Sequence, residues 1–158
     1  MPSPLELKVP PPAVALASAG VMKLLSWLPG RGALADAATG ESLQTLAPAI
    51  AALGIGIALA GVVEFRRADT TVNPHKPQNS SRLVTSGIYR YTRNPMYLGI
   101  AVVLLAWAAW LGSAWSLPGI AMFAAYLTRF QIIPEERTLL RIFGTEFEDY
   151  RKRVRRWI

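Results

Sequence analysis

Four apolar runs divide the chain and limit the folds that are open to it. They cover residues 9–28, 43–65, 94–111 and 114–133, and each approaches the roughly 20 residues that an α-helix needs to cross a bilayer. Inside a bilayer the backbone must satisfy its own hydrogen bonds, which helices do within each segment. The runs therefore predict an all-α polytopic membrane protein with about four transmembrane helices, in one domain over residues 1–158.

The basic residues flank these runs, and their placement predicts the orientation of the chain. There are 17 Lys and Arg residues against 10 Asp and Glu, which gives a net charge of +7. Residues 66–93 carry six of the basic residues and residues 129–158 carry eight, whereas segments 29–42 and 112–113 together carry one. Because Lys and Arg accumulate on the cytoplasmic side of membrane proteins, we expect both termini and the 66–93 loop in the cytoplasm. We expect the charge to meet anionic lipid headgroups, and no nucleic acid.

Two absences narrow the chemistry that the chain can perform. It has no cysteine and a single histidine, His75. Cysteine–zinc sites, thiolate catalysis and multi-histidine metal centres are therefore excluded, and we expect no metal site. The sequence also has no alternation of strands and helices and no glycine fingerprint that opens a helix, which excludes a Rossmann-type domain.

The segment over residues 83–99, LVTSGIYRYTRNPMYLG, leads a polar loop directly into the third apolar run. Asn94 suits the N-cap of a helix and Pro95 suits its first position. A helix start offers unpaired N–H groups and a positive dipole end, which favour an anion. Glu135 and Glu136 follow the next apolar run, and a hairpin of the third and fourth runs brings them to the same membrane edge, where they can face a cation. The sequence thus predicts a site for a ligand that carries both charges.

After the fourth run, two short helices are expected at the membrane interface. Pro134 is predicted to begin the first helix, and Gly144 is predicted to end it. Residues 146–158 form the second helix, which is amphipathic and ends in RKRVRRWI. This basic end with an apolar anchor is predicted to bind lipid headgroups and to take no part in catalysis.

Two long patterns in the chain resemble those of a known superfamily. The patterns are L-V-T-S-G-x-Y-x-x-x-R-N-P-x-Y-x-G and P-E-E-x-x-L-x-x-x-F-G-x-x-F-x-x-Y-x-x-x-V-x-R. They are similar to those of the isoprenylcysteine carboxyl methyltransferase and phospholipid methyltransferase superfamily, in its small bacterial membrane form, and the motif-bearing part covers residues 70–158. The resemblance implies S-adenosylmethionine as methyl donor and a lipophilic acceptor that enters from the membrane. It also implies a place in the bacterial inner membrane, with the site facing the cytoplasm.

The resemblance also assigns roles to individual residues by position. The implied cofactor contacts are Leu83, Val84, Tyr89, Asn94, Pro95, Tyr97 and Glu135, with Ser81 and Arg82 as extensions. The predicted catalytic residues are Arg93 and Glu136.

Gln131 is the predicted acceptor-binding residue. The carboxyl methyltransferases have an arginine at this position, and a neutral amide cannot replace its bidentate bond to a carboxylate. Arg129 could supply the missing charge, but it lies about 200° away around a regular helix. We therefore expect an acceptor with an uncharged nucleophile, such as a lipid amine, a hydroxyl or a lipophilic thiol. Two alternatives stay open, namely phospholipid or amine N-methylation as against O- or S-methylation, and a non-catalytic membrane scaffold that keeps the fold of the cofactor site.

Overall fold

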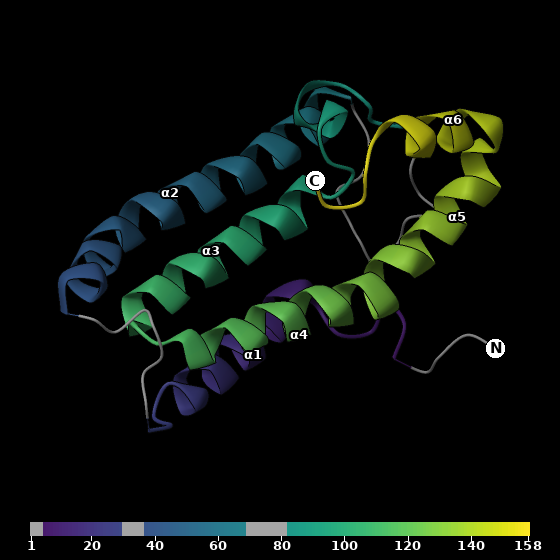
Figure 1. The fold of residues 1–158 in the computed structure, drawn as a ribbon. Coiled ribbons are helices and arrows are strands. Elements are labelled where there is room, and N and C mark those ends of the chain that lie inside the picture. Colours follow the sequence, from purple (N-terminus) through teal and green to yellow (C-terminus); the bar gives the residue numbers. More distant parts are fainter. Residues whose placement is uncertain (1–4, 30–36, 69–81) are drawn as a thin grey trace.

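The computed structural model describes residues 5–29, 37–68 and 82–158. Within these ranges every regular element is helical, which confirms the all-α prediction. The α-helices are α1 (Pro11–Leu25), α2 (Ala37–Arg67), α3 (Pro95–Leu111), α4 (Leu117–Leu127), α5 (Ile133–Phe143) and α6 (Thr145–Arg153). Shorter elements are the 3₁₀ turns η3 (Gly87–Arg90) and η4 (Ala114–Ser116) and the π-helical η5 (Thr128–Ile132). Figure 1 shows α1 to α4 as long rods beside one another, with α5 continuing the line of α4 and α6 folded back beyond it.

Helix α2 is best suited to cross a membrane. Residues Leu43–Arg67 have a mean hydropathy of 2.3, and in the described part of the chain α2 alone is long and apolar enough to span. Only 17% of its apolar window is buried inside the protein, whereas a core helix of a soluble protein would be mostly buried. An apolar helix that leaves this much of its surface uncovered needs apolar surroundings.

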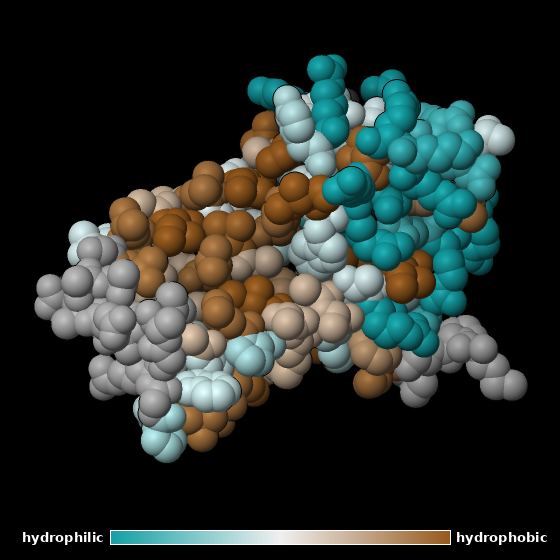
Figure 2. All heavy atoms as spheres, in the orientation of Figure 1, coloured by the Kyte–Doolittle hydropathy of each residue, from teal (hydrophilic) through white to brown (hydrophobic). Residues whose placement is uncertain are grey.

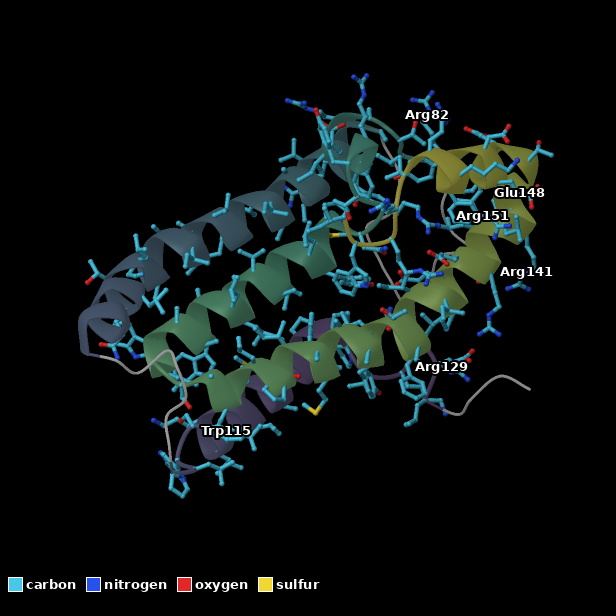
Figure 3. All side chains as sticks on the ribbon, viewed as in Figure 1. Arg82, Trp115, Arg129, Arg141, Glu148 and Arg151 are labelled. Atoms are coloured by element: carbon cyan, nitrogen blue, oxygen red, sulfur yellow. The ribbon has the colours of Figure 1, made fainter. Side chains whose placement is uncertain are left out.

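The prediction of four spans stays a prediction. Helices α1 and α3 are apolar but have 15 and 17 residues, and the predicted span over 114–133 is part of a longer rod that runs on into α5. Large apolar side chains are nevertheless exposed along the rods, including Leu16, Leu53, Leu59, Leu105, Trp110 and Met122. Figure 2 shows this part of the molecule as apolar and the end that carries α5 and α6 as polar. Trp115 lies at the apolar end, far from Arg141 and Arg151 (Figure 3).

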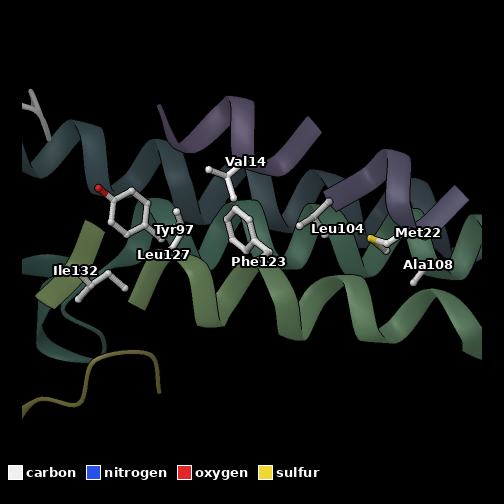
Figure 4. Close-up of a cluster of buried hydrophobic side chains, with 8 residues drawn as sticks. All are labelled: Val14, Met22, Tyr97, Leu104, Ala108, Phe123, Leu127 and Ile132. Carbon is white, nitrogen blue, oxygen red and sulfur yellow. The ribbon is translucent and has the colours of Figure 1, made fainter. Parts of the chain in front are cut away.

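The core runs along the inside of the bundle, between α1, α3 and α4. Its buried members are Val14, Met22, Tyr97, Leu104, Ala108, Phe123, Leu127 and Ile132 (Figure 4). Helix α2 packs on the other side of α3, and the two backbones meet at glycines. A Cβ on Gly54 would lie 2.7 Å from the carbonyl oxygen of Gly99, and one on Gly99 would lie 2.5 Å from that of Gly54. This contact, which leaves no room for a side chain, holds α3 firmly against α2.

Pro134 is the second residue of α5, whose first turn carries Glu135 and Glu136, so the predicted helix start is confirmed to within one residue, but the residues before it are helical as well. The residue before α5, Ile132, has helical dihedral angles (φ −67°, ψ −49°), and the chain passes from α4 through η5 into α5 without a break. A proline has no N–H for the carbonyl four residues earlier, which here belongs to Phe130. That carbonyl accepts a hydrogen bond of 3.0 Å from the N–H of Leu7. A donor far away in the sequence therefore lets Pro134 lie inside a helical rod.

The end of the chain also differs from the prediction. Helix α6 ends at Arg153 and the next residue is extended, so the helix expected over 146–158 stops early. Residues 154–158 run back toward the start of α3 (Figure 1). Arg156 and Trp157 are partly buried there. Part of the segment that was assigned to lipid headgroups therefore packs against the protein itself.

Candidate functional site

The start of α3 has the expected residues, but their hydrogen bonds differ from the expected ones. Asn94 occupies the N-cap position and Pro95 follows at the first helical position, as predicted. The side chain of Asn94 makes no capping hydrogen bond to a described residue, and its Nδ2 donates at 2.8 Å to the carbonyl of Arg156. The first turn of α3 therefore has N–H groups that no side chain caps, at the positive end of the helix dipole.

Glu135 connects the start of α3 to the rod of α4 and α5. Its Oε1 accepts hydrogen bonds from the hydroxyl of Tyr97 and from Nε2 of Gln131, both at 2.7 Å. Tyr97 and Gln131 are 6% and 2% exposed, so this cluster lies inside the protein. Burial raises the pKa of Glu135 to about 7, although the two hydrogen bonds favour the charged form. Glu135 therefore changes its charge near neutral pH, and its ionised form suits a cationic ligand group.

Arg93 and Glu136, the two predicted catalytic residues, form an ion pair. Arg93 Nη1 lies 3.0 Å from Glu136 Oε1, and the two side chains are 11% and 17% exposed. Arg156 donates two further hydrogen bonds to this carboxylate, at 2.9 and 2.7 Å. Burial lowers the pKa of Arg93, and the charge of Glu136 opposes this shift. Nε and Nη1 of Arg93 are buried and make no aligned hydrogen bond to a described residue. Because Nη1 faces the charge of Glu136, Nε is the donor that remains for another acceptor.

Tyr89 lies in η3 with an unused hydroxyl. It is 4% exposed, its ring meets that of Phe65 edge-on at 5.4 Å, and its carbonyl accepts a hydrogen bond of 2.8 Å from the hydroxyl of Tyr150. Its own hydroxyl is buried and bonds to no described residue. Burial raises the pKa of Tyr89, and the nearby charges of Tyr150, Glu135 and Glu64 add to this shift. A buried hydroxyl without a partner marks a place for a ligand atom.

A cleft of about 200 Å³, with both polar and apolar lining residues, lies between the end of α2 and the segment that precedes η3. Among the described residues its lining consists of Glu64, Arg67, Ala68, Arg82, Leu83, Val84, Thr85 and Ser86. The carboxylate of Glu64 accepts a hydrogen bond of 2.6 Å from the hydroxyl of Ser86 and pairs with Arg67 at 3.2 Å. Gly87 has a φ of 54°, and a Cβ there would overlap the side chain of Glu64. The glycine turn thus allows the loop to close on this carboxylate.

The remaining predicted cofactor residues take different positions. Val84 is buried and Leu83 is partly buried, and both line the cleft. Arg82 lines the same cleft with an exposed side chain (Figure 3). Pro95 is fully buried at the start of α3. Ser81 lies outside the described residues.

Arg129 does not take the place of the missing arginine. Its side chain is 52% exposed and pairs with Glu6 at 3.0 Å (Figure 3 shows it pointing away from α3). The side chain of Gln131 instead points into the protein and bonds Glu135. The neutral amide is therefore the group at this position, as the sequence indicated.

Two charged residues join the site although their roles were not predicted. Arg156 was assigned to lipid headgroups, yet it bonds Glu136. The only sequence signal for it was its place at the end of the V-x-R pattern. Glu64 lies at the end of the second apolar run, residues 43–65, yet it forms a wall of the cleft. It takes this role because the loop at Ser86 and Gly87 folds back onto the end of α2, a contact that the local sequence does not specify.

Comparison with known proteins identifies the family. A family model described as phospholipid methyltransferase matches residues 43–146, which include most of α2, all of α3 to α5 and both halves of the Tyr97–Glu135 cluster. The chain belongs to the phospholipid methyltransferase family. This finding confirms the superfamily that the two sequence patterns resemble. No solved structure gives a significant match to the chain.

Three relatives illustrate the range of the superfamily. An uncharacterised protein of Haemophilus influenzae is 41% identical over 63 residues, which are 40% of this chain and the whole of that protein. The protein-S-isoprenylcysteine O-methyltransferase of Schizosaccharomyces pombe is 32% identical over 114 residues, 70% of this chain and 47% of its own length. Methanethiol S-methyltransferase 1 of Bradyrhizobium diazoefficiens is 35% identical over 82 residues, 50% of this chain and 27% of its own length. The chain thus spans less than half the length of the two named enzymes.

Proposed function

We propose that this member of the phospholipid methyltransferase family is a membrane enzyme that transfers a methyl group from S-adenosylmethionine to a lipophilic acceptor. The observation that carries the proposal is the buried cluster in which Tyr97 and Gln131 bond Glu135 beside the start of α3. The family supports methyl transfer in general. The donor and the class of acceptor are our proposal.

The residues of the site fit S-adenosylmethionine, which supplies an electrophilic methyl group on a sulfonium. Ionised Glu135 matches the ammonium of the donor. The uncapped first turn of α3 and the unused Nε of Arg93 match its carboxylate. The free hydroxyl of Tyr89 and the carboxylate of Glu64 in the cleft offer bonds to its ribose hydroxyls. The charges and hydrogen-bonding groups therefore suit both ends of the molecule.

The proposed role of the protein in this reaction is to orient the donor and the acceptor and to exclude water. Methyl transfer from a sulfonium is an in-line displacement, for which positioning and exclusion of water supply much of the acceleration. Two hydrogen bonds fix Glu135, and the ion pair with Glu136 fixes Arg93 just before α3. The buried rings of Tyr89 and Tyr97 provide π-faces of the kind that attract a cation such as a sulfonium. These roles need neither a covalent nucleophile nor a metal.

The acceptor is proposed to present an uncharged nucleophile. Gln131 is 2% exposed and bonds the same carboxylate oxygen as Tyr97, so it adds no positive charge at this position. An anionic carboxylate beside Glu135 would meet a negative group without the bidentate arginine that could balance it. A lipid amine, a hydroxyl or a lipophilic thiol avoids this repulsion. The proposal therefore includes two alternative reactions, methylation of a nitrogen and methylation of a sulfur or oxygen.

We place the site at the cytoplasmic face of a bacterial inner membrane. The N-H of Leu7 and the carbonyl of Arg155 bond residues at the same end of the bundle, so both ends of the described chain lie there. The exposed arginines Arg82, Arg141 and Arg151 lie at this end as well (Figure 3). Basic residues favour the cytoplasmic side and anionic headgroups, which supports this orientation.

The first test is donor binding and methyl transfer by the detergent-purified protein. Calorimetric titration with S-adenosylmethionine should give saturable binding, and labelled donor with a total membrane-lipid extract should give a labelled lipophilic product. A folded protein that neither binds the donor nor labels any lipid would support the scaffold alternative and contradict the proposal.

The second test addresses the acceptor. Wild type and Gln131→Arg are assayed side by side with a prenylcysteine carboxylate, a lipophilic amine and a lipophilic thiol. Wild type should methylate the amine or the thiol and leave the carboxylate largely unchanged, and Gln131→Arg should shift the preference toward the carboxylate. Efficient esterification by wild type, with no gain in Gln131→Arg, would show that residue 131 does not set the acceptor.

A further inference from the structure

We propose that Arg156 is a positioning residue of the methyl-transfer site, through which the tail over residues 154–158 holds Glu136 and the Arg93–Asn94 turn in place. The inference rests on the proposed function for its kinetic part, but its structural part can be tested without it. According to this inference, the basic tail orients residues of the site and does not only bind lipid headgroups.

The side chain of Arg156 holds Glu136 in one orientation. Nε donates to Oε1 at 2.9 Å and Nη2 donates to Oε2 at 2.7 Å, so both carboxylate oxygens are engaged by one planar group. Paired parallel bonds of this kind fix direction as well as distance. Arg93 lies 3.0 Å from the same carboxylate, but its Nη1 is not aligned for a hydrogen bond. Arg156 is therefore the group that orients the carboxylate of Glu136. The position of that carboxylate in turn determines where its ion-pair partner, Arg93, is held.

The backbone of the tail holds the turn before α3. The N–H of Arg93 donates at 3.0 Å to the carbonyl of Arg155, and Nδ2 of Asn94 donates at 2.8 Å to the carbonyl of Arg156. The hydroxyl of Thr92 lies 3.5 Å from the latter carbonyl and accepts from the N–H of Asn94 at 3.2 Å. Three consecutive residues that lead into α3 thus depend on two consecutive carbonyls of the tail.

The next residue of the tail anchors it to the other half of the site. Nε1 of Trp157 donates at 3.1 Å to the hydroxyl of Thr128, the first residue of η5, and its ring packs against the core. The tail therefore bridges the two elements that carry Arg93 and Gln131. Arg93 precedes α3 and Gln131 lies in η5, so a segment that bonds both regions helps to fix the position of one relative to the other.

The expected kinetic signature follows from this arrangement. Glu135, the proposed contact of the donor ammonium, is held by Tyr97 and Gln131 and by no residue of the tail. Loss of the Arg156 side chain should therefore weaken donor binding less than Glu135→Gln does, because the contact with the donor ammonium stays and only the contacts of Arg93 and the α3 start with its carboxylate are loosened. It should lower kcat about ten- to a hundredfold, because a small misplacement of groups around the reacting atoms costs rate of this order.

The experiment compares Arg156→Ala, Arg156→Lys and the matched control Arg155→Ala. Arg155 is exposed, and its side chain bonds to no described residue. We expect the control to behave like wild type and the lysine variant to recover part of the loss, because an ammonium keeps the charge but cannot form the paired bonds. Melting temperature and gel filtration in detergent show whether each variant is folded. If Arg156→Ala does not fold, the same measurements are made on Arg156→Lys.

Two readouts decide the inference. In the double mutant with Glu136→Gln, kcat should fall no further than in the worse single mutant, since both changes break one unit. Amide hydrogen exchange at Arg93 should be faster in Arg156→Ala than in wild type and Arg155→Ala, whether or not methylation occurs. Wild-type kcat in a folded Arg156→Ala, or unchanged exchange at Arg93, would overturn the inference. If wild type fails to methylate any acceptor, the proposed function fails, and the exchange experiment alone decides whether Arg156 positions the turn.

Discussion

Replacement of Glu135 by glutamine removes the charge that we propose to hold the donor ammonium, and it keeps the size of the side chain. The carboxylate is engaged by two hydrogen bonds of 2.7 Å, and glutamine retains one oxygen that can accept them. A charge-assisted hydrogen bond contributes about 1.5–3 kcal/mol, so its loss should weaken the binding of S-adenosylmethionine about ten- to over a hundredfold. Isothermal titration of purified protein at pH 8 measures this change. Glu146→Gln, a change at an exposed glutamate of α6, is the matched control.

The same carboxylate gives this prediction a pH dependence. With a pKa of about 7, Glu135 is mostly ionised at pH 8 and mostly protonated at pH 6. If only the ionised form holds the ammonium, the dissociation constant of wild type should rise about tenfold between pH 8 and pH 6. The glutamine variant has no such group, so its affinity should change little over this range. An unchanged dissociation constant in the folded variant, or an equal pH dependence in both proteins, would remove Glu135 from the donor site.

Stability in the absence of donor should move in the opposite direction with pH. The pKa of Glu135 is raised from 4.5 to about 7 in the folded protein, so the folded state binds the proton more tightly than the unfolded state. The resulting stabilisation is fully present below about pH 4.5 and is lost as the pH rises through about 7. The melting temperature of wild type should therefore fall relative to that of Glu135→Gln between pH 5 and pH 8. A constant difference between the two melting temperatures would argue against a raised pKa.

Two further predictions concern the fold and its orientation. Gly54→Ala should destabilise the protein by about 1–3 kcal/mol, because the new Cβ meets the carbonyl of Gly99 at 2.7 Å, whereas Gly56→Ala on the same helix has open space and should be neutral or slightly stabilising. Equal melting temperatures of the two variants would contradict the close contact. Reporter fusions after Ile158 and within residues 31–41 should report opposite compartments, and the same compartment for both would contradict the proposed topology.

The features that follow from local chemistry could be predicted from the sequence. The Asn94–Pro95 start of α3 lies where capping preferences place it. Gly112 and Gly144 end α3 and α5, with φ of 59° and 51°, as residues with no Cβ do most easily. The pairing of Gln131 with Glu135 also follows from a spacing of one helical turn. Each of these depends on neighbours within a few residues.

The features that were missed depend on partners far away in the sequence. Pro134 is a breaker by its own chemistry, and only the N–H of Leu7, bonded to Phe130, makes its position inside a rod acceptable. Likewise, the V-x-R pattern marks Arg156 but gives no sign of its partner, because Glu136 lies 20 residues earlier. A basic end with a tryptophan has the same composition whether it meets lipid or protein. Composition alone could not separate these two cases.

The glycine contact between α2 and α3 has a consequence for the response of the protein to bilayer thickness. The candidate span of α2, Leu43–Arg67, is about 37 Å long including the charged last turn, so its apolar length is close to the roughly 30 Å hydrocarbon core, whereas α3 is about 25 Å long and falls short of it. Gly61 lies against Pro95 at the first residue of α3, so the last turns of α2, which carry Glu64, project beyond that point. In the predicted four-span arrangement, a bilayer that matches α2 is too thick for α3, and because the two helices cannot slide apart, lipids of different acyl length should tilt them together with the cleft. The rate in reconstituted vesicles should then pass through a maximum at one acyl-chain length.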